Sequence, residues 1–232
     1  MAEVFEQKLF TEPSGSIKIP KSSPADGQIT WPKLEETFSS HDEMDLIVKK
    51  CQKCPLGETK TNGVVYDGNP QAKLMLIGEG PGEQEDLQGL PFVGRAGQLL
   101  DKILEAANID RKTETYICNI VKCRPPNNRV PAQFEAEQCI GYLKYQIDYV
   151  KPKIILLLGS TALTGVLKMK NPKITKLHGS WIDGEGELLQ GIKIMPFYHP
   201  SYLLRNPSKN VGGPKWQAWQ AIKEVRKELD SL

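Results

Sequence analysis

Four acidic residues stand in a glycine-rich segment, GEGPGEQEDLQGLPFVGRAG, at residues 78–97. The acids are Glu79, Glu83, Glu85 and Asp86, and the apolar run KLMLIG directly precedes them. A carboxylate in such a place could orient a water molecule or stabilise a developing positive charge. A glycine-rich turn after a strand usually binds phosphate, but carboxylates repel phosphate. The segment therefore looks like a poor phosphate loop, and its ligand has to be sought elsewhere in the sequence.

The cysteines form a second group that could do chemistry. Cys51 and Cys54 form a C-x-x-C pair after an expected first helix, Cys123 lies in a turn, and Cys139 lies on the helix that follows. Four thiolates from separated elements can hold either zinc or an iron–sulfur cluster, and the spacing leaves both open. Cys118 falls inside an expected strand and is interpreted as a small buried apolar residue.

Two further polar residues follow expected strands. Asn119 stands in NIVKCRPPNNR, where an asparagine can also serve simply as a turn former. His199, in YHPSYLLRNP, is the one histidine of three that follows a strand within such a motif. His41 is interpreted as a helix cap or surface residue, and His178 as a loop residue.

The elements that position these residues are predicted from four short apolar runs, at residues 73–78, 115–120, 153–159 and 192–197. Their near-continuous apolar character is typical of parallel strands covered on both faces. Helical periodicity fills the gaps between them. We therefore predict an α/β fold: a three-layer α/β/α domain over residues 41–232 around a short, four-stranded, mostly parallel sheet. Residues 1–40, rich in Pro, Ser and Gly, are predicted to form a flexible tail.

All of the unusual motifs follow predicted strand ends. In open α/β sheets ligands bind at the carboxyl ends of the strands. GEGPGEQED, NIVKCRPPNNR, GSTA and YHPSYLLRNP are thus expected to converge on one site.

The composition of the chain indicates the cellular compartment and the class of binding partner to expect. No apolar run approaches the ~20 residues of a membrane span, and MAEVFEQKLF lacks a secretory signal, so a cytoplasmic protein without a membrane partner is expected. The net charge of +2 conceals a basic stretch at residues 111–176, with 12 Lys and Arg against 4 Asp and Glu. Such a stretch suits nucleic acid, although a solvated lysine-rich surface would look the same.

The chain from Cys51 onward resembles the family 4 uracil-DNA glycosylases. The resemblance is carried by GEGPGEQED followed by PFVGRAG, then NIVKCRPPNNR and HPSYLLRNP, together with the cysteine pattern. It implies a DNA repair enzyme that flips uracil out of single- or double-stranded DNA and hydrolyses its N-glycosidic bond, leaving an abasic site. It also implies one four-iron–four-sulfur cluster, with no nucleotide cofactor, held by Cys51, Cys54, Cys123 and Cys139. In a bacterium the protein would be nucleoid-associated.

The resemblance assigns roles in a uracil pocket. Phe92 would stack on the base, Asn119 would pair with N3–H and O4, and His199 would donate to O2 as negative charge develops there. Backbone groups around Gly80 and Gly82 would assist. Family 1 relatives have a catalytic aspartate where this chain has Gly80, so the water-activating carboxylate is sought in the same segment: the candidates are Glu79 and Glu85, with Asp86 third and Glu83 interpreted as a solvated charge.

Other residues are expected at the DNA. Leu203 resembles the apolar wedge that fills the gap left by a flipped base. Arg205, Ser201 and Ser160 are expected to meet phosphates. Leu204 is interpreted as ordinary packing, and the basic surface would be extended by Lys122, Arg124 and Arg129.

Two alternatives stay open beside this hypothesis. One is a branch that bonds covalently to the abasic sugar; it has GEQPG and an inserted basic loop with a nucleophilic histidine, whereas this chain has GEGPG and no such insertion. The other is a non-catalytic iron–sulfur DNA-binding module associated with replication or repair. Phe5, Leu9 and Phe10 of the tail could bind a replication or repair protein, and a monomer is expected.

Overall fold

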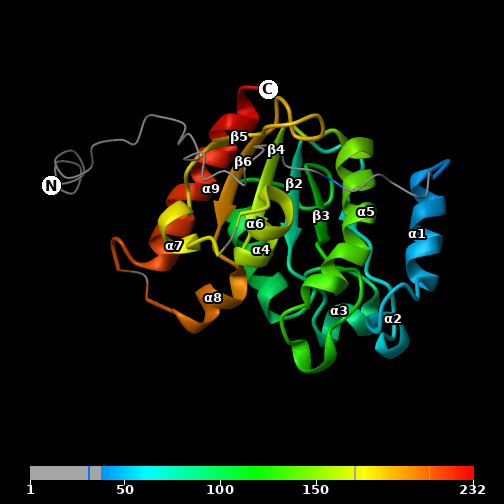
Figure 1. Ribbon diagram of the computed structural model, residues 1–232. Coiled ribbons are helices and arrows are strands. Elements are labelled where there is room, and N and C mark those ends of the chain that lie inside the picture. Colours follow the sequence, from blue (N-terminus) through cyan, green and yellow to red (C-terminus); the bar gives the residue numbers. More distant parts are fainter. Residues whose placement is uncertain (1–30, 32–37, 170, 209) are drawn as a thin grey trace, which may run out of the picture.

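The computed structural model describes residues 31, 38–169, 171–208 and 210–232 (Figure 1). The predicted tail, with Phe5, Leu9 and Phe10, lies almost wholly outside the described residues. In the described part, a mixed sheet with the strand order β1-β3-β2-β4-β6-β5 lies between helices on both faces. The predicted three-layer α/β/α fold is therefore confirmed.

The four central strands are parallel and coincide with the four apolar runs. They are β2 (Leu74–Gly78), β3 (Thr115–Asn119), β4 (Ile154–Leu158) and β6 (Lys193–Phe197). Every residue of β2, β3 and β4 is buried, as expected for strands covered on both faces. Because the strands are parallel, their carboxyl ends meet at one edge, where Gly78 is the register partner of Asn119.

Two edge strands extend the sheet beyond the predicted four. β1 (Asp67–Gly68) pairs antiparallel with β3, and β5 (Ile182–Asp183) pairs antiparallel with β6. The prediction missed them because each has only two residues and no apolar run. Their antiparallel direction makes the sheet mixed.

The helices bury their apolar faces in two separate cores, one on each face of the sheet. On one face lie α1 (His41–Lys50), α5 (Gln133–Val150) and α6 (Ser160–Leu167); on the other lie α4 (Arg95–Ala106), α8 (Pro200–Arg205) and α9 (Pro214–Asp230). The short helical elements are α2 (Leu56–Thr59), α3 (Glu83–Gln88), η1 (Pro126–Asn128) and α7 (Ile174–Leu177). No helix in the described ranges is long and apolar enough to cross a membrane.

The first helix begins where capping chemistry predicts. The hydroxyl of Ser40 accepts a hydrogen bond from the backbone N–H of Glu43 at 3.1 Å, so Ser40 is the N-cap. The interpretation of His41 as a cap or surface residue is wrong, because this side chain is only 4% exposed. Its Nε2 lies 2.7 Å from the hydroxyl of Tyr116, which attaches α1 to β3.

The motif-bearing loops all leave the sheet at the carboxyl ends of the parallel strands. In Figure 1, α3 at the lower right and α8 at the lower left both lie toward the lower end of the sheet, where these strands finish. The predicted convergence of the motifs is thus a consequence of the parallel topology.

Candidate active site

Phe92, Asn119 and His199 meet at the carboxyl edge of the sheet. Asn119 ends β3, Phe92 lies between α3 and α4, and His199 follows β6 as the N-cap of α8. The rings of Phe92 and His199 have centroids 5.8 Å apart. A Cβ atom on Gly78 would lie 2.4 Å from Oδ1 of Asn119 and 2.5 Å from Cζ of Phe92, so only glycine allows this close approach.

The amide of Asn119 is incompletely hydrogen-bonded. The side chain is 1% exposed, and its Oδ1 has no hydrogen-bond partner within the described structure. Because a buried acceptor without a partner costs free energy, such an atom calls for an explanation. Oδ1 lies next to the ring of Phe92, because a Cβ atom on Gly78 would contact both of them.

His199 is held as a neutral donor. Burial, reinforced by the positive charge of Arg205, lowers the pKa of His199 to about 4, so the imidazole is uncharged at neutral pH. The backbone N–H of Ser201 donates to Nδ1 at 3.2 Å, and the Ser201 hydroxyl lies 2.7 Å from the same atom. With Nδ1 acting as acceptor, the ring proton resides on Nε2, which can donate to a ligand.

The backbone of Phe92 is strained. Its φ of +54° is in the left-handed region, which non-glycine residues rarely adopt and which is enriched at functional sites. Glu85 holds one side of this turn, because its Oε1 accepts hydrogen bonds from the backbone N–H groups of Val93 at 2.9 Å and Gly94 at 2.7 Å. Its Oε2 accepts from the N–H of Gly82, the N-cap of α3, at 3.2 Å. Both carboxylate oxygens of Glu85 are thus engaged with the backbone.

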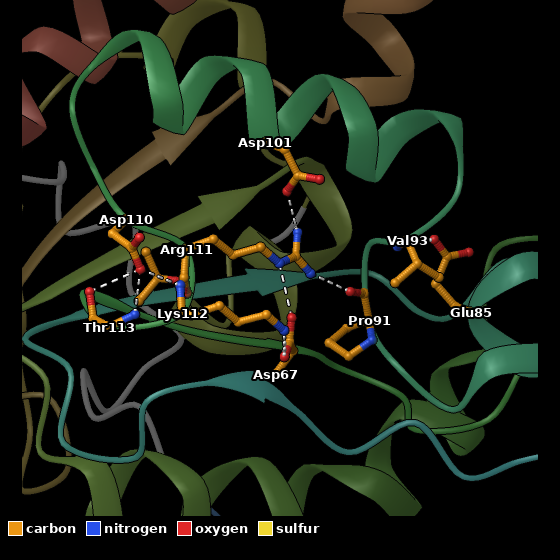
Figure 2. A network of polar contacts seen from close by, with 10 residues as sticks. Asp67, Glu85, Pro91, Val93, Asp101, Asp110, Arg111, Lys112 and Thr113 are labelled. Carbon is orange, nitrogen blue, oxygen red and sulfur yellow. Dashed lines mark hydrogen bonds and ion pairs between the residues drawn. The ribbon is translucent and has the colours of Figure 1, made fainter.

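Arg111 holds the other side of the turn, as Figure 2 shows. Its Nη2 donates to the carbonyl of Pro91 at 2.7 Å, directly before Phe92. The same guanidinium pairs with Asp101 of α4 at 2.6 Å and with Asp67 of β1 at 2.9 Å. Arg111 lies between α4 and β3, outside every motif, so its role was not predicted from the sequence.

The other acids of the glycine-rich segment are separated in space. Glu79 follows β2 directly, and its Oε2 accepts a short hydrogen bond from the hydroxyl of Thr161. Asp86 is 3% exposed, and its Oδ1 accepts from the N–H groups of Thr61 at 2.9 Å and Asn62 at 3.1 Å. Asp86 is therefore committed to holding the loop at residues 61–62. Thr161 was not predicted; the signal was its place in GSTA, just after a strand end.

Gly80 also stands where space is limited. A Cβ atom there would lie 2.6 Å from Cγ2 of Val121, so an aspartate at this position would require Val121 to move. Glu83 is 63% exposed and lies 3.8 Å from Nη1 of Arg124, consistent with the solvated charge predicted for it. Of the three acids of this segment that are not exposed, Glu79 is thus the one whose carboxylate contacts no backbone N–H in the described hydrogen-bond network.

The four predicted ligand cysteines lie within electrostatic reach of one another. Cys54, Cys123 and Cys139 are buried and Cys51 is partly exposed. Burial, with smaller contributions from Cys139, Cys51 and Cys54, raises the pKa of the Cys123 thiol to about 12. Nowhere in the described ranges do three or more His, Cys, Asp or Glu side chains surround the position of a single metal ion. Cys118 is fully buried, as predicted.

Comparison with known proteins agrees with these motifs. The family described as the uracil DNA glycosylase superfamily matches residues 65–223. The chain belongs to this superfamily. It is 49% identical to a type-4 uracil-DNA glycosylase of Thermotoga maritima over 75% of this chain and 90% of that protein. It is 43% identical to the type-4 enzyme of Saccharolobus solfataricus over 72% of this chain and 79% of that protein.

In this superfamily member, some of the residues expected to contact DNA are exposed and others are buried. Ser160 begins α6 and Arg205 ends α8, and both are exposed. Leu203 is 1% exposed and belongs to the core beneath α8, so it does not fit the predicted wedge role. Leu204, interpreted as ordinary packing, is 37% exposed. Successive helical residues face different directions, and nothing in HPSYLLRNP indicates which of the two leucines faces outward.

The predicted basic surface also needs correction. Lys122 is 1% exposed and is a core residue. Arg129 forms a bidentate pair with Glu135, at 2.8 and 2.7 Å, and Nε of Arg124 donates to Asn128 at 2.8 Å. The motif NIVKCRPPNNR therefore contributes less positive charge to the surface than its composition implies.

Proposed function

We propose that this chain is a DNA repair hydrolase that removes uracil from single- or double-stranded DNA and leaves an abasic site. The observation that carries the proposal is the buried Oδ1 of Asn119, which has no partner within the described residues and lies beside the ring of Phe92, itself 5.8 Å from the ring of His199 between centroids. Relatives named as type-4 uracil-DNA glycosylases, at 40–49% identity, support it.

Asn119 would read the base. Oδ1 is an acceptor and matches N3–H of uracil, while the Nδ2 group of the same amide matches O4. Cytosine presents an acceptor at N3 and a donor at C4, so both contacts would become unfavourable. A buried site that loses a hydrogen-bond match in this way discriminates strongly. Phe92 would supply the stacking face for a base flipped out of the helix.

His199 would stabilise the leaving group. When the bond between C1′ and N1 breaks, its electron pair goes to the uracil ring and negative charge collects at O2. The Nε2–H of the neutral imidazole can donate a hydrogen bond to O2 as this negative charge develops. Ser201 would act here by positioning His199, because it contacts Nδ1 through both its N–H and its hydroxyl.

Glu79 would serve the sugar side of the reaction. The sugar becomes positively charged as the bond breaks, and water then adds to C1′ with loss of a proton. The Thr161 hydroxyl occupies Oε2 of Glu79, leaving Oε1 to orient that water and stabilise the cation. We assign the catalytic role to Glu79, and to Glu85 the role of positioning Phe92, because the oxygens of Glu85 already accept three backbone hydrogen bonds.

The contacts with DNA follow from exposure. Leu204, at 37% exposure, is the leucine of α8 that can fill the gap left by a flipped base, in place of Leu203. We expect Arg205 and Ser160, which are both exposed, to contact phosphates near the same edge of the sheet.

The four cysteines fit a four-iron–four-sulfur cluster. The thiols of Cys139, Cys51 and Cys54 lie near enough to that of Cys123 to affect its pKa, and four thiolates are the ligand set that such clusters use. When bound, the cluster would cross-link the loop after α1, the loop after β3, and α5. Because hydrolysis of the N-glycosidic bond transfers no electron, its contribution is structural.

The test is an excision assay on oligonucleotides carrying one uracil, with thymine and cytosine oligonucleotides of the same sequence as controls. Alkali cleaves the strand wherever a base has been removed. Strand breaks confined to the uracil substrate, in single- and double-stranded form, are the expected result. Absence of breaks in all substrates would reject the proposed function.

A further inference from the structure

Glu79 has a main chain that is firmly held and a side chain with one direct support. The backbone N–H of Val121 donates to the carbonyl of Glu79 at 3.1 Å. The side chain is partly buried, and no ion pair in the described part of the chain involves its carboxylate. Among the described residues, one hydrogen-bond donor reaches that carboxylate, the hydroxyl of Thr161. Because glutamate has several rotatable bonds, the place of its carboxylate depends on this donor.

Thr161 is well suited to hold a carboxylate in one orientation. An ionised carboxylate can only accept hydrogen bonds, so the hydroxyl is the donor in this contact. Thr161 is the second residue of α6, and a β-branched side chain in a helix has few χ1 rotamers. The direction of the hydroxyl is therefore set by the helix. With Oε2 of Glu79 occupied by Thr161, Oε1 is the oxygen left for a water molecule.

The turn before Thr161 lies against His199. Gly159 has φ +94°, and its N–H donates to the carbonyl of Phe197 at 2.9 Å. A Cβ atom on Gly159 would lie 3.2 Å from Cβ of His199, in a conformation that residues other than glycine rarely adopt. The absence of a side chain at Gly159 thus lets the turn between β4 and α6 approach His199 closely, two residues before Thr161.

The body of α6 is fixed next to the third pocket residue. Leu163 is fully buried, and a Cβ atom on Gly165 would lie 2.7 Å from Cδ1 of Ile120. Ile120 directly follows Asn119 in the chain, so α6 rests on the segment that carries the base-reading amide. The helix that presents Thr161 therefore has a fixed position relative to both Asn119 and His199.

We propose that Thr161 is a positioning residue for Glu79: its hydroxyl holds Oε2 and thereby fixes Oε1 where the water that adds to C1′ is oriented. Because the same helix contacts His199 through its first turn, Thr161 sets the acid on the sugar side relative to the donor on the uracil side. The inference rests on the proposed function, which assigns the catalytic role to Glu79.

The test measures kcat and KM for uracil excision by T161V, T161A and T161S, with T164V as the control. Valine keeps the branched shape of threonine without the hydroxyl, alanine lacks both, and serine keeps the hydroxyl. Thr164 is an exposed threonine on the same helix. T161V and T161A should lower kcat about 10- to 100-fold with KM near the wild-type value, because a misplaced catalytic group affects the chemical step.

T161S should retain most of the wild-type kcat, and T164V should be unchanged. Wild-type kcat in T161V would overturn the inference. So would a kcat for T161S as low as that of T161V, because packing of the methyl group, and not the hydroxyl, would then be what matters.

A second comparison establishes that Thr161 acts through Glu79. In an E79A background, T161V should lower kcat no further, because the group that Thr161 positions is already absent. Effects of E79A and T161V that simply multiply would overturn the positioning role.

Urea unfolding of the wild-type protein, E79A, T161V and the double variant gives a readout that does not depend on activity. The shifts of the unfolding midpoint should not add, because each single variant already removes the hydrogen bond between the two side chains. Additive shifts would overturn the inference even if uracil is excised. If the wild-type protein excises no uracil, the proposed function fails, and the midpoints still report whether Thr161 holds Glu79.

Discussion

At the scale of single residues, the pocket is defined by complementary hydrogen-bonding groups. Asn119 offers an unpartnered acceptor, and His199 offers a donor from a neutral ring. Asn119 is buried and His199 is partly exposed, and in the proposed function each group matches one edge of uracil. Asn119 and His199 can therefore be tested separately from the rest of the fold.

Substitution of Asn119 by Ala should lower kcat/KM for uracil excision about 10- to 100-fold, because at least one buried hydrogen bond to the base is lost. The same change should leave the unfolding temperature equal or raise it, because it removes a buried acceptor that has no partner. Excision kinetics and thermal unfolding, measured on one preparation, check both expectations. Wild-type excision by N119A would contradict the assigned role.

The pH dependence follows from the pKa of His199, which burial lowers from 6.5 to about 4. Protonation would add a proton to Nδ1, the atom that accepts from the N–H of Ser201, and this should not occur as pH falls through 6.5. Excision should therefore not lose activity at the pKa of an ordinary histidine. A decline is expected only as pH approaches about 4. Activity that halves near pH 6.5 would contradict a neutral, buried His199.

The free energy of unfolding, unlike excision activity, should already change as pH falls below 6.5. The pKa of His178 is also lowered by burial to about 4, so between pH 6.5 and about 4 the unfolded chain binds protons that the folded chain excludes. The free energy of unfolding should therefore be fully present above pH 6.5 and decrease as pH falls toward 4. Urea unfolding at several pH values measures this slope, and H178Q should make it shallower.

At the scale of elements, the turn between α3 and α4 carries strain that other elements offset. Glu85 and Arg111 hold Val93 and Pro91, on either side of Phe92. Glu85 could act on the reaction directly or could position Phe92. Arg111 distinguishes these roles, because it is distant in sequence but holds the same turn, so a shared positioning role would couple the two residues.

E85Q and R111M should each lower kcat/KM for uracil, and the double variant should lose less than the product of the two single effects, because both residues hold one turn. K112M is the matched control: Lys112 shares Asp67 with Arg111, at 2.6 Å, and has no hydrogen bond to the turn in the described network. Kinetics of the four proteins give the coupling. Fully independent effects would argue that Glu85 acts directly on the reaction.

The two leucines of α8 should behave differently. L204A should reduce excision from duplex DNA more than from single strands, because the wedge matters only where a base must leave a helix, and stability should change by about 0.5 kcal/mol or less. L203A should instead cost about 2–5 kcal/mol of stability, because it opens a cavity in the core. Equal losses on both substrates for L204A would contradict the wedge assignment.

At the scale of the whole molecule, the periodicity of apolar residues and the order of the motifs were enough to predict the parallel strands and the edge at which the motifs converge. Four apolar runs placed the parallel strands, and parallel topology brought Phe92, Asn119 and His199 to one edge. Strands β1 and β5 were missed because two residues carry no pattern.

The errors concern the direction in which side chains point. Lys122 and His41 are polar residues that packing has enclosed, and nothing in their local sequence indicates this. Leu203 and Leu204 are likewise indistinguishable in sequence and differ in the direction that their side chains face. The contacts of Arg111 were also unpredictable, because they reach α4, β1 and the turn at Phe92.

The central claim is that the pocket around Asn119 releases uracil by hydrolysis. The most direct measurement quantifies free uracil by mass spectrometry, and abasic sites in the DNA, after incubation of the wild-type protein with uracil-containing DNA. Equal amounts of the two products, sharply reduced with N119A, are the predicted result. Absence of free uracil with the wild-type protein, or equal release by N119A, would contradict the account.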